Sequence, residues 1–147
     1  MATINDVSNY SFWDNLYNQN LDKWNLNKPT PEFINWESSL EIEKNNINIC
    51  VPGCGTSEDA LYLASKGYNV YCIDFSEVAT TILREKAKKE KVTINIINED
   101  FFNLSSSYSF FFDFIIEYTF YCAINPSMRS KYVKLCHEIL KSNGRIV

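Results

Sequence analysis

Histidine is almost absent from this chain of 147 residues, which has one histidine and five cysteines. A zinc site needs several histidines or cysteines at short spacing, whereas Cys50 and Cys54 form a single C-x-x-x-C pair and His137 lies far along the chain. A serine–histidine catalytic arrangement is equally unsupported. Cys50, Cys72 and Cys136 fall in apolar runs, where a free thiol behaves as a small hydrophobe. We therefore expect reduced, buried thiols and no metal site.

Positive charge is also scarce, because 14 Lys and Arg stand against 18 Asp and Glu, for a net charge of −4. No lysine-rich run is present to neutralise phosphates or to attract an anionic membrane, so nucleic acid and lipid are poor candidates for a partner. The first ten residues do not indicate a signal peptide, and Asp113 interrupts the most apolar run, residues 110–116. We expect a cytoplasmic protein whose partner is a small molecule.

Apolar surface is what the chain does have, with 46% hydrophobic and 15% aromatic residues, enough for a single folded domain over residues 1–147. Short β-branched or aromatic runs alternate with amphipathic helical stretches, which predicts an α/β fold with a doubly wound, mostly parallel sheet covered on both faces. The predicted strands are residues 46–50, 69–74, 92–97 and 112–116, with a fifth beginning at Arg145. The predicted helices are residues 8–24, 31–42, 57–66, 76–90 and a last helix from Pro126.

Local signals predict several helix boundaries. Thr56, with Asp59 three residues later, resembles a capping box, and Asn125 before a proline suits the start of the last helix. The Asn-Gly pair at residues 143–144 predicts a left-handed end to that helix. These signals place the helices between the predicted strands.

A glycine-containing turn, residues 51–59 (VPGCGTSED), joins the first predicted strand to a helix. Gly53 and Gly55 allow a sharp bend and the close approach of a ligand, although such a turn is as often plain chain geometry. Glu58 stands where a dinucleotide fingerprint requires its third glycine, which disfavours NAD and any pyrophosphate. Asp74 ends the second strand about 20 residues after the turn, where doubly wound folds place an acid that binds ribose hydroxyls. Capping of the next helix is the alternative for this acid.

Aromatic residues follow the third predicted strand. Asp100 ends that strand and precedes Phe101 and Phe102, so a hydrogen-bond acceptor lies next to a ring face. Such a pair is suited to an adenine, whose amino group it can bind and whose ring it can contact. Core packing is the alternative for both rings and is favoured for Phe102.

A second aromatic tract, residues 117–129, follows the fourth strand at the edge of the sheet where open α/β folds bind ligands. Tyr118, Phe120 and Tyr121 either wall a dry pocket for a cationic ligand or pack in the core. Arg129 either faces an anion there or pairs with surface acids.

Several separated segments resemble one family, the S-adenosylmethionine-dependent methyltransferases that act on thiopurines, thiols, thiocyanate and halides. The chain is most similar to the thiocyanate/halide branch. The matching segments include residues 24–31 (WNLNKPTP), 51–55 (VPGCG), 72–77 (CIDFSE), 99–102 (EDFF), 112–129 (FDFIIEYTFYCAINPSMR) and 140–144 (LKSNG). Any class I methyltransferase can have the glycine turn, but its combination with the DFF and aromatic segments is characteristic of this family. The resemblance implies the Rossmann-like fold of class I methyltransferases.

The resemblance also implies S-adenosyl-L-methionine as the cofactor. Carried over position by position, the family's cofactor contacts fall on Trp13, Tyr17, Trp24, Gly53, Asp74, Asp100, Phe101 and Tyr118. The glycine turn would approach the methionine part, Asp74 the ribose, and Asp100 with Phe101 the adenine. Residues 1–45 would form an N-terminal helical lid over an incomplete Rossmann-like core of residues 46–147.

The chain departs from the family pattern at a few of these positions. Tyr17 stands where the family usually has tryptophan, and Asn25 and Asn27 replace an aspartate and a glycine after Trp24. Glu117 replaces an aspartate before the tyrosine of the aromatic tract. We expect each of these changes to be mild.

Length is the larger departure, because relatives continue through a complete fifth strand and a final pair of strands. We therefore expect a C-terminally truncated chain: a fragment, a short product that forms a homodimer through its open sheet edge, or a cofactor binder without turnover. The activity implied by the resemblance is transfer of a methyl group from S-adenosylmethionine to a small soft nucleophile (thiol, bisulfide, thiocyanate or halide ion). For this reaction we expect Tyr118 and Arg129 to hold the anion. The alternatives are a noncatalytic S-adenosylmethionine-binding or interaction protein and, more weakly, a nucleotide-dependent oxidoreductase.

Overall fold

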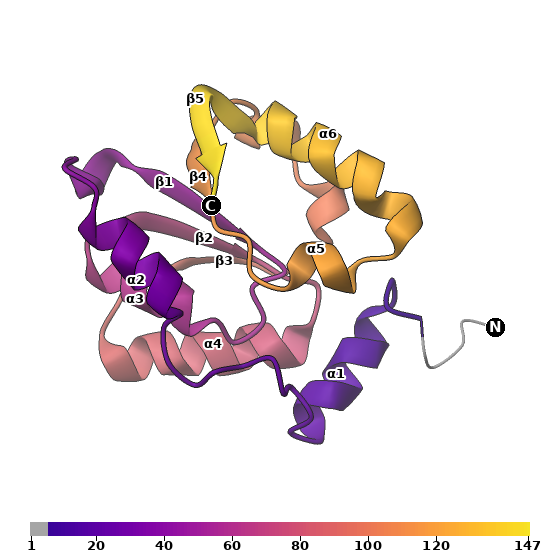
Figure 1. Ribbon diagram of the computed structural model, residues 1–147. Helices are drawn as coiled ribbons and strands as arrows, with labels where there is room; N and C mark the ends of the chain where they lie inside the picture. The colour runs from indigo at the N-terminus through magenta and orange to yellow at the C-terminus, as the bar shows by residue number, and fades with distance from the viewer. Residues whose placement is uncertain (1–5) are drawn as a thin grey trace.

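The computed structural model describes residues 6–147 and contains a five-stranded parallel sheet in the order β3-β2-β1-β4-β5 (Figure 1). The strands are β1 (Asn48–Pro52), β2 (Asn69–Ile73), β3 (Asn95–Ile97), β4 (Phe112–Ile115) and β5 (Leu140–Ile146). The α-helices are α1 (Tyr10–Asn18), α2 (Pro31–Ser38), α3 (Glu58–Ser65), α4 (Glu77–Glu90), α5 (Phe120–Ala123) and α6 (Arg129–Ile139). Short 3-10 helices are η1 (Lys44–Asn46), η2 (Phe101–Asn103), η3 (Ser106–Tyr108) and η4 (Pro126–Met128). Residues 1–5 of the predicted lid lie outside the described residues.

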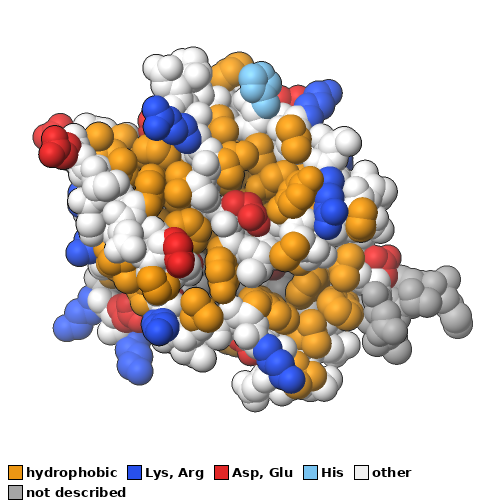
Figure 2. All heavy atoms as spheres, in the orientation of Figure 1, with side chains coloured by type: hydrophobic (Ala, Val, Ile, Leu, Met, Phe, Trp, Pro, Cys, Tyr) orange, Lys and Arg blue, Asp and Glu red, His pale blue; other side chains and the backbone are white. Residues whose placement is uncertain are grey.

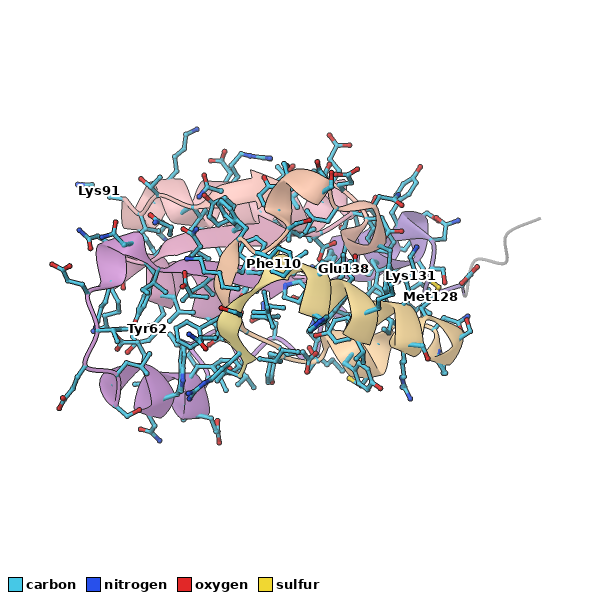
Figure 3. The ribbon with its side chains drawn as sticks, turned by 90° about the horizontal axis from the view of Figure 1, so that it is seen from above. Tyr62, Lys91, Phe110, Met128, Lys131 and Glu138 are labelled. Atoms are coloured by element: carbon cyan, nitrogen blue, oxygen red, sulfur yellow. The ribbon has the colours of Figure 1, made fainter. Side chains whose placement is uncertain are left out.

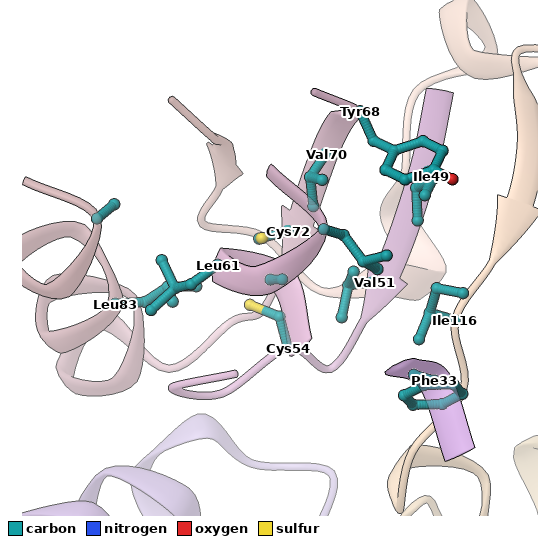
Figure 4. Packing of buried hydrophobic residues seen from close by; sticks show 13 residues of the cluster. Phe33, Ile49, Val51, Cys54, Leu61, Tyr68, Val70, Cys72, Leu83 and Ile116 are labelled. Atoms are coloured by element: carbon teal, nitrogen blue, oxygen red, sulfur yellow. The ribbon is translucent and has the colours of Figure 1, made fainter. Parts of the chain in front are cut away.

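Side chains of the central strand β1 alternate between the two faces of the sheet, as the pleat requires. Ile49 and Val51 pack with α2, α3 and α4 in one hydrophobic core, where Leu61 and Leu83 are completely buried (Figure 4). Cys50 points to the opposite face and packs in a second core with η2 and α6. The predicted doubly wound sheet is therefore confirmed, and β1 has no face exposed to water.

The first helix ends earlier than its apolar pattern predicts. Asn20 adopts a left-handed conformation (φ +54°), and the amide of Leu21 donates to the carbonyl of Leu16 (2.8 Å) while that of Asn20 donates to Tyr17 (3.1 Å). These two bonds are those of a Schellman motif, which stops α1 at Asn18. Trp24 consequently lies in a loop instead of on the predicted helix, and α2 is also shorter than predicted.

The predicted capping box at the start of α3 is wrong by one residue. Ser57, not Thr56, caps the helix, because its hydroxyl accepts from the amide of Ala60 (3.1 Å). Asp59 instead accepts from the amide (2.6 Å) and the hydroxyl (2.9 Å) of Thr30. A tertiary contact with the loop before α2 therefore uses the carboxylate that the local pattern assigned to the helix end.

The C-terminal strand differs most from prediction. Strand β5 begins at Leu140, so residues 143–144 lie inside the strand and do not end a helix. Leu140 pairs with Phe112 and Arg145 pairs with Phe114, so the residues between them bulge out of the ladder. A Cβ atom at residue 144 would lie 3.0 Å from the carbonyl oxygen of Phe112. The glycine therefore permits a close backbone approach in the bulge.

Contacts hold α6 at both of its ends. As predicted, Asn125 begins this helical segment, because its side chain accepts from the amide of Ser127 in η4 (3.0 Å). At the other end the amide of Phe110 donates to the carbonyl of Glu138 (3.0 Å), and the two residues lie together in Figure 3, far from Met128. Helix α6 therefore runs along the sheet, from the side where the strands have their carboxyl ends to the side where β4 begins.

Candidate functional site

Two cavities lie at the carboxyl ends of the strands, around the turn between β1 and α3. The large cavity has a volume of about 580 Å³, with walls from α1, from the loops after β1, β2 and β3, and from the segment of α5 and η4. Figure 2 shows apolar side chains gathered on this face between α5 and α1. The small cavity, of about 60 Å³, lies where β1 neighbours β4. Three residues, Trp24, Gly53 and Thr119, line both the large and the small cavity. The strand order reverses at this position, which is where open α/β sheets bind ligands.

The large cavity brings together most of the residues that the sequence singled out. Its walls include Trp13, Tyr17, Trp24, Gly53, Asp74, Asp100 and Phe101. Tyr118 lines the small cavity instead. Within residues 6–147, Arg129 lines neither of these two cavities, although the preceding residue, Met128, lines the large one.

The glycine turn is in contact with an aromatic ring at each of its glycines. Gly53 (φ +54°) and Gly55 (φ +51°) both adopt the left-handed conformation. A Cβ atom at Gly53 would lie 2.0 Å from a ring carbon of Phe120, and one at Gly55 would lie 2.4 Å from the hydroxyl of Tyr17. Glycine is therefore needed at both positions for its backbone conformation and for the space that it leaves to a ring.

Asp74 is the acid at the end of β2, and its side chain is buried, with 8% of its surface exposed. Its Oδ2 accepts from the amide of Gly55 (2.8 Å) and its Oδ1 accepts from the amide of Ser76 (2.8 Å). Burial raises the pKa of Asp74 to about 6, although both amide bonds act to lower it. Capping of α4 is done by Ser76, whose hydroxyl accepts from Ala79 (3.1 Å). Because each carboxylate oxygen has a further lone pair, Asp74 retains acceptor capacity for a ligand in the cavity.

The segment after β3 forms another part of the cavity wall. The side chain of Asp100 accepts from the amide of Phe102 (3.0 Å) and caps η2. Phe101 is 3% exposed and packs edge to face on Phe120, with ring centroids 5.6 Å apart. Phe102 is half-buried beneath the ammonium of Lys131, 5.4 Å from its ring centroid. Both phenylalanines pack in the second core and also line the cavity, so the two readings of these rings are compatible.

Three aromatic side chains from the N-terminal segment cover the cavity. Trp24 packs edge to face on Trp13 (centroids 5.7 Å apart) and on Tyr17 (5.9 Å). The indole nitrogen of Trp13 donates to the carbonyl of Val7 (2.8 Å), which satisfies its polar group within the protein. Burial raises the pKa of Tyr17 well above its ordinary range, with the nearby Asp74 carboxylate adding to the shift. Tyr17 is therefore a neutral phenol over the glycine turn.

Asp14 fastens α1 to the rest of the molecule. Its carboxylate accepts from the hydroxyl of Ser76 (2.5 Å) and from the amide of Val78 (3.4 Å) at the N-terminus of α4. A carboxylate at this position also complements the positive end of the helix dipole. Sequence reasoning missed this contact, since nothing local links residue 14 to the start of α4.

Tyr118 and Arg129, the two candidates for holding an anion, lie in different surroundings. Tyr118 is 37% exposed, and its hydroxyl donates to the carbonyl of Trp24 (3.4 Å). The guanidinium of Arg129 lies 5.0 Å from the ring centroid of Tyr121, and its buried Nε has no hydrogen-bond partner among the described residues. Arg129 therefore stacks on an aromatic ring instead of pairing with a surface carboxylate.

Sequence reasoning missed several residues of the cavity walls. Cys122 and Met128 line the large cavity, and Lys28 lines the small one. Cys122 belongs to α5, a helix of four residues that begins after Thr119 in a left-handed conformation (φ +61°). Four residues are too few for a periodic pattern, so their place inside the aromatic tract was the only available signal.

Two further observations concern residues 6–147 only. No three His, Cys, Asp or Glu side chains in this span are placed to hold one metal ion together. No helix in the same span is long and apolar enough to cross a bilayer.

Comparison with known proteins gives one family. The family model of thiopurine S-methyltransferases matches residues 8–147. Among curated proteins, the chain is 29% identical to probable thiol methyltransferase 2 and 29% identical to thiocyanate methyltransferase 1, both of Arabidopsis thaliana. In each case the match covers 92% of this chain and 59% of the relative, so the chain spans less than two thirds of their length. It is also 26% identical to a thiopurine S-methyltransferase of Legionella pneumophila (strain Paris), over 92% of this chain and 67% of that protein.

Solved structures show the same fold. A 1,6-didemethyltoxoflavin-N1-methyltransferase of Burkholderia thailandensis, with bound 1,6-didemethyltoxoflavin and S-adenosylhomocysteine, has a TM-score of 0.75 at 17% identity, covering 93% of this chain and 58% of that one. A putative S-adenosyl-L-methionine-dependent methyltransferase of Methanococcus maripaludis has a TM-score of 0.70 at 16% identity, covering 96% and 63%. The predicted Rossmann-like fold of class I methyltransferases is confirmed.

Proposed function

Because the chain belongs to the thiopurine S-methyltransferase family, we propose that its large cavity binds S-adenosyl-L-methionine and that the protein transfers the methyl group to a small soft nucleophile. The nucleophiles we propose are thiols, bisulfide, thiocyanate and halide ions. The observation that supports this proposal most is the single cavity wall that unites the glycine turn, two strand-end aspartates and the aromatic side chains of the N-terminal segment.

The residues of this cavity suit the parts of the cofactor. The volume of about 580 Å³ lies in the range of pockets that enclose a small organic ligand. The free lone pairs of Asp74 would accept hydrogen bonds from ribose hydroxyls. Asp100 and Phe101 would bind the amino group and the ring of the adenine, and Gly53 would let the backbone approach the methionine part.

The cavity also suits the chemistry. S-adenosylmethionine supplies a methyl group on a positively charged sulfur, so attack by an anion cancels charge as the transition state forms. Water opposes this cancellation, and Trp13, Tyr17 and Trp24 would exclude water by covering the cavity. The remaining rate acceleration would come from positioning, because the site would hold the nucleophile in line with the methyl carbon and the sulfur. An anion needs no general base, which agrees with the place of His137 on the exposed side of α6.

We propose that Tyr118 and Arg129 hold the incoming anion, with Arg129 acting from behind the wall of the large cavity, next to Met128, since it lines neither cavity itself. The Tyr118 hydroxyl makes only a long bond to a carbonyl (3.4 Å), so its hydrogen is available to a better acceptor. The Nε of Arg129 is buried without a partner among the described residues, which an anionic or carbonyl acceptor would satisfy.

The activity is tested by incubating the protein with methyl-labelled S-adenosylmethionine and iodide, bisulfide or thiocyanate, and counting volatile label in the headspace. We expect label above background with at least one of these anions. Asp74→Ala is the matched control, because it removes the proposed ribose contact and should lower release at a cofactor concentration near the dissociation constant of the native chain. Background label from the native chain, with cofactor binding shown by calorimetry, would contradict turnover and would instead indicate a noncatalytic S-adenosylmethionine-binding protein.

A further inference from the structure

The small cavity differs in character from the large one. It lies at the junction of β1 and β4 and takes its walls from the glycine turn, the start of α3 and the loop between α1 and α2. Lys28 is the only basic residue among the described residues that line either cavity. Trp24, Gly53 and Thr119 line both cavities, so the two cavities adjoin at the glycine turn.

The acidic groups of the small cavity already have partners. Glu58 forms an ion pair with Lys86, whose ammonium also donates to the carbonyl of Thr56 (3.2 Å). Asp59 is buried and accepts both the amide and the hydroxyl of Thr30. The ammonium of Lys28 forms no ion pair or hydrogen bond within residues 6–147, so it is the uncommitted charge at this cavity.

A polar group beside Lys28 also has a hydrogen to donate. The hydroxyl oxygen of Thr56 is in a buried residue and accepts from the side-chain amide of Asn25 (2.9 Å). Because a hydroxyl accepts and donates at once, the Thr56 hydrogen remains available to an acceptor in the cavity. One cation and one hydroxyl donor together suit a carboxylate.

The chain on both sides of Lys28 is fixed to the site. Asn25 binds Thr56 on one side, and Thr30 binds Asp59 on the other. Between them Asn27 turns the chain in a left-handed conformation (φ +53°), with its amide donating to the side chain of Asn25 (2.9 Å). The lysine therefore projects from a short, doubly anchored loop, which reduces the ordering that binding requires.

We infer that the small cavity holds the amino-acid end of the cofactor and that Lys28 is the counter-ion of its carboxylate, with the Thr56 hydroxyl as a second donor. This inference rests on the proposed function, because it assigns one end of the same ligand. In a chain with net charge −4, and with the Asp59 carboxyl group at this cavity, a ligand carboxylate is favoured only where a cation lies next to it. Lys28 makes this subsite selective for ligands that retain the carboxylate.

The test compares two ligands that differ only in that group: S-adenosylmethionine and its decarboxylated form, which keeps the adenosine, the sulfonium and the amine. Dissociation constants are measured by calorimetry for the native chain, Lys28→Ala, Lys28→Arg and Lys23→Ala. Lys23 is the matched control, since it is an exposed lysine of the same segment that lines neither cavity.

We expect Lys28→Ala to weaken binding of S-adenosylmethionine about two- to fivefold, the range for an ion pair of an exposed lysine. Binding of the decarboxylated ligand should stay the same or become tighter, because the substitution removes the Lys28 ammonium, which repels this positively charged ligand. Lys28→Arg should bind both ligands like the native chain, and Lys23→Ala should change neither affinity by more than about twofold. Thermal unfolding of each variant checks that the fold is intact.

The two proposals fail differently. If the native chain binds both ligands and Lys28→Ala weakens both equally, or neither, the lysine is not a carboxylate partner and this inference is overturned while the proposed function stands. If the native chain binds neither ligand, the proposed function is overturned, and this inference with it.

Discussion

At the scale of single residues, Asp74 couples cofactor binding to pH. Burial raises its pKa to about 6 from an ordinary value of 3.8, so the folded protein binds this proton more tightly than the unfolded chain does. The ionised carboxylate therefore lowers the stability of the native state at neutral pH, and this cost is relieved as the pH falls through about 6. Ribose hydroxyls donating to the ionised form would offset the same cost, which is why a buried carboxylate at a ligand site is a functional candidate.

We expect the affinity for 5′-methylthioadenosine, whose adenine and ribose do not titrate near neutral pH, to be constant above about pH 7 and to fall as the pH drops through about 6. The reason is that protonation removes the acceptor capacity that Asp74 offers. Calorimetry at several pH values checks this profile. Asp74→Ala should weaken binding by one to a few kcal/mol, about the value of charged hydrogen bonds, and should flatten the profile. An unchanged profile in that variant would remove Asp74 from the site.

The two left-handed glycines Gly53 and Gly67 provide a matched pair. Gly67 (φ +97°) has open space where a Cβ would lie, whereas Gly53 has the ring of Phe120 there. Gly67→Ala should cost about 1–2 kcal/mol of unfolding free energy, the backbone cost alone. Gly53→Ala should cost about 1–3 kcal/mol more, because the added methyl overpacks the ring. Urea denaturation measures both, and equal losses would mean that the ring does not restrict this turn.

At the scale of elements, α1 has one buried side chain, that of Tyr17, which lies on the glycine turn. The carboxylate of Asp14 adds hydrogen bonds to the start of α4, and the remaining side chains of α1 are half-buried or exposed. Elements held by few buried contacts open locally at lower free energy than the sheet does. We expect such local opening of α1, because a helix that covers a cavity must move aside to admit a ligand.

Asp14→Ala should therefore release α1 without unfolding the sheet. We expect a loss of about 0.5–2 kcal/mol in the local stability of residues 10–18, the cost of losing a capping carboxylate. Hydrogen exchange measures it, with residues 48–52 of β1 as the internal reference. Asp6→Ala, which removes an equal charge from an exposed local bond to Ser8, should leave α1 unchanged. Equal effects of the two variants would show that charge, and not the tertiary contact, stabilises α1.

The elements that could be predicted from sequence are those with a strong local pattern. The strand run at residues 69–74 and the helix at 76–90 match β2 and α4 closely, because apolar periodicity, and for α4 a serine cap, mark both. Helix α5 was missed because four residues are too few for a periodic pattern, and the β5 bulge was missed because it depends on pairing with β4. The site residues came from motif positions, while the contact of Tyr17 with Gly55 arises only when α1 folds back over the turn.

At the scale of the whole molecule, the two cores determine which thiols can react. Cys50, Cys54, Cys72 and Cys136 are buried, and Cys122 is exposed. Burial raises the pKa of Cys50, Cys54 and Cys136, so their reactive thiolates are rare in the folded state. Cys50, Cys72 and Cys136 are free and buried, as predicted, and Cys54 and Cys122 are also free.

Reaction with Ellman's reagent should therefore detect one fast thiol in the folded protein and five after denaturation. Because Cys122 lines the large cavity, S-adenosylhomocysteine should slow the fast reaction. Cys122→Ser should abolish the fast phase and serves as the control. A fast phase that the ligand does not affect would place the cofactor away from the α5 wall.

The contact of Phe120 with Gly53, and of Tyr17 with Gly55, has an evolutionary consequence. Replacement of either glycine costs less stability once its aromatic neighbour has become smaller, so the order in which mutations are accepted is constrained. Reversal is disfavoured in the same way, because restoring the large ring would crowd the new side chain. Descendants of this protein should therefore show paired changes at these positions, a form of epistasis that ties the history of the N-terminal segment to that of the turn.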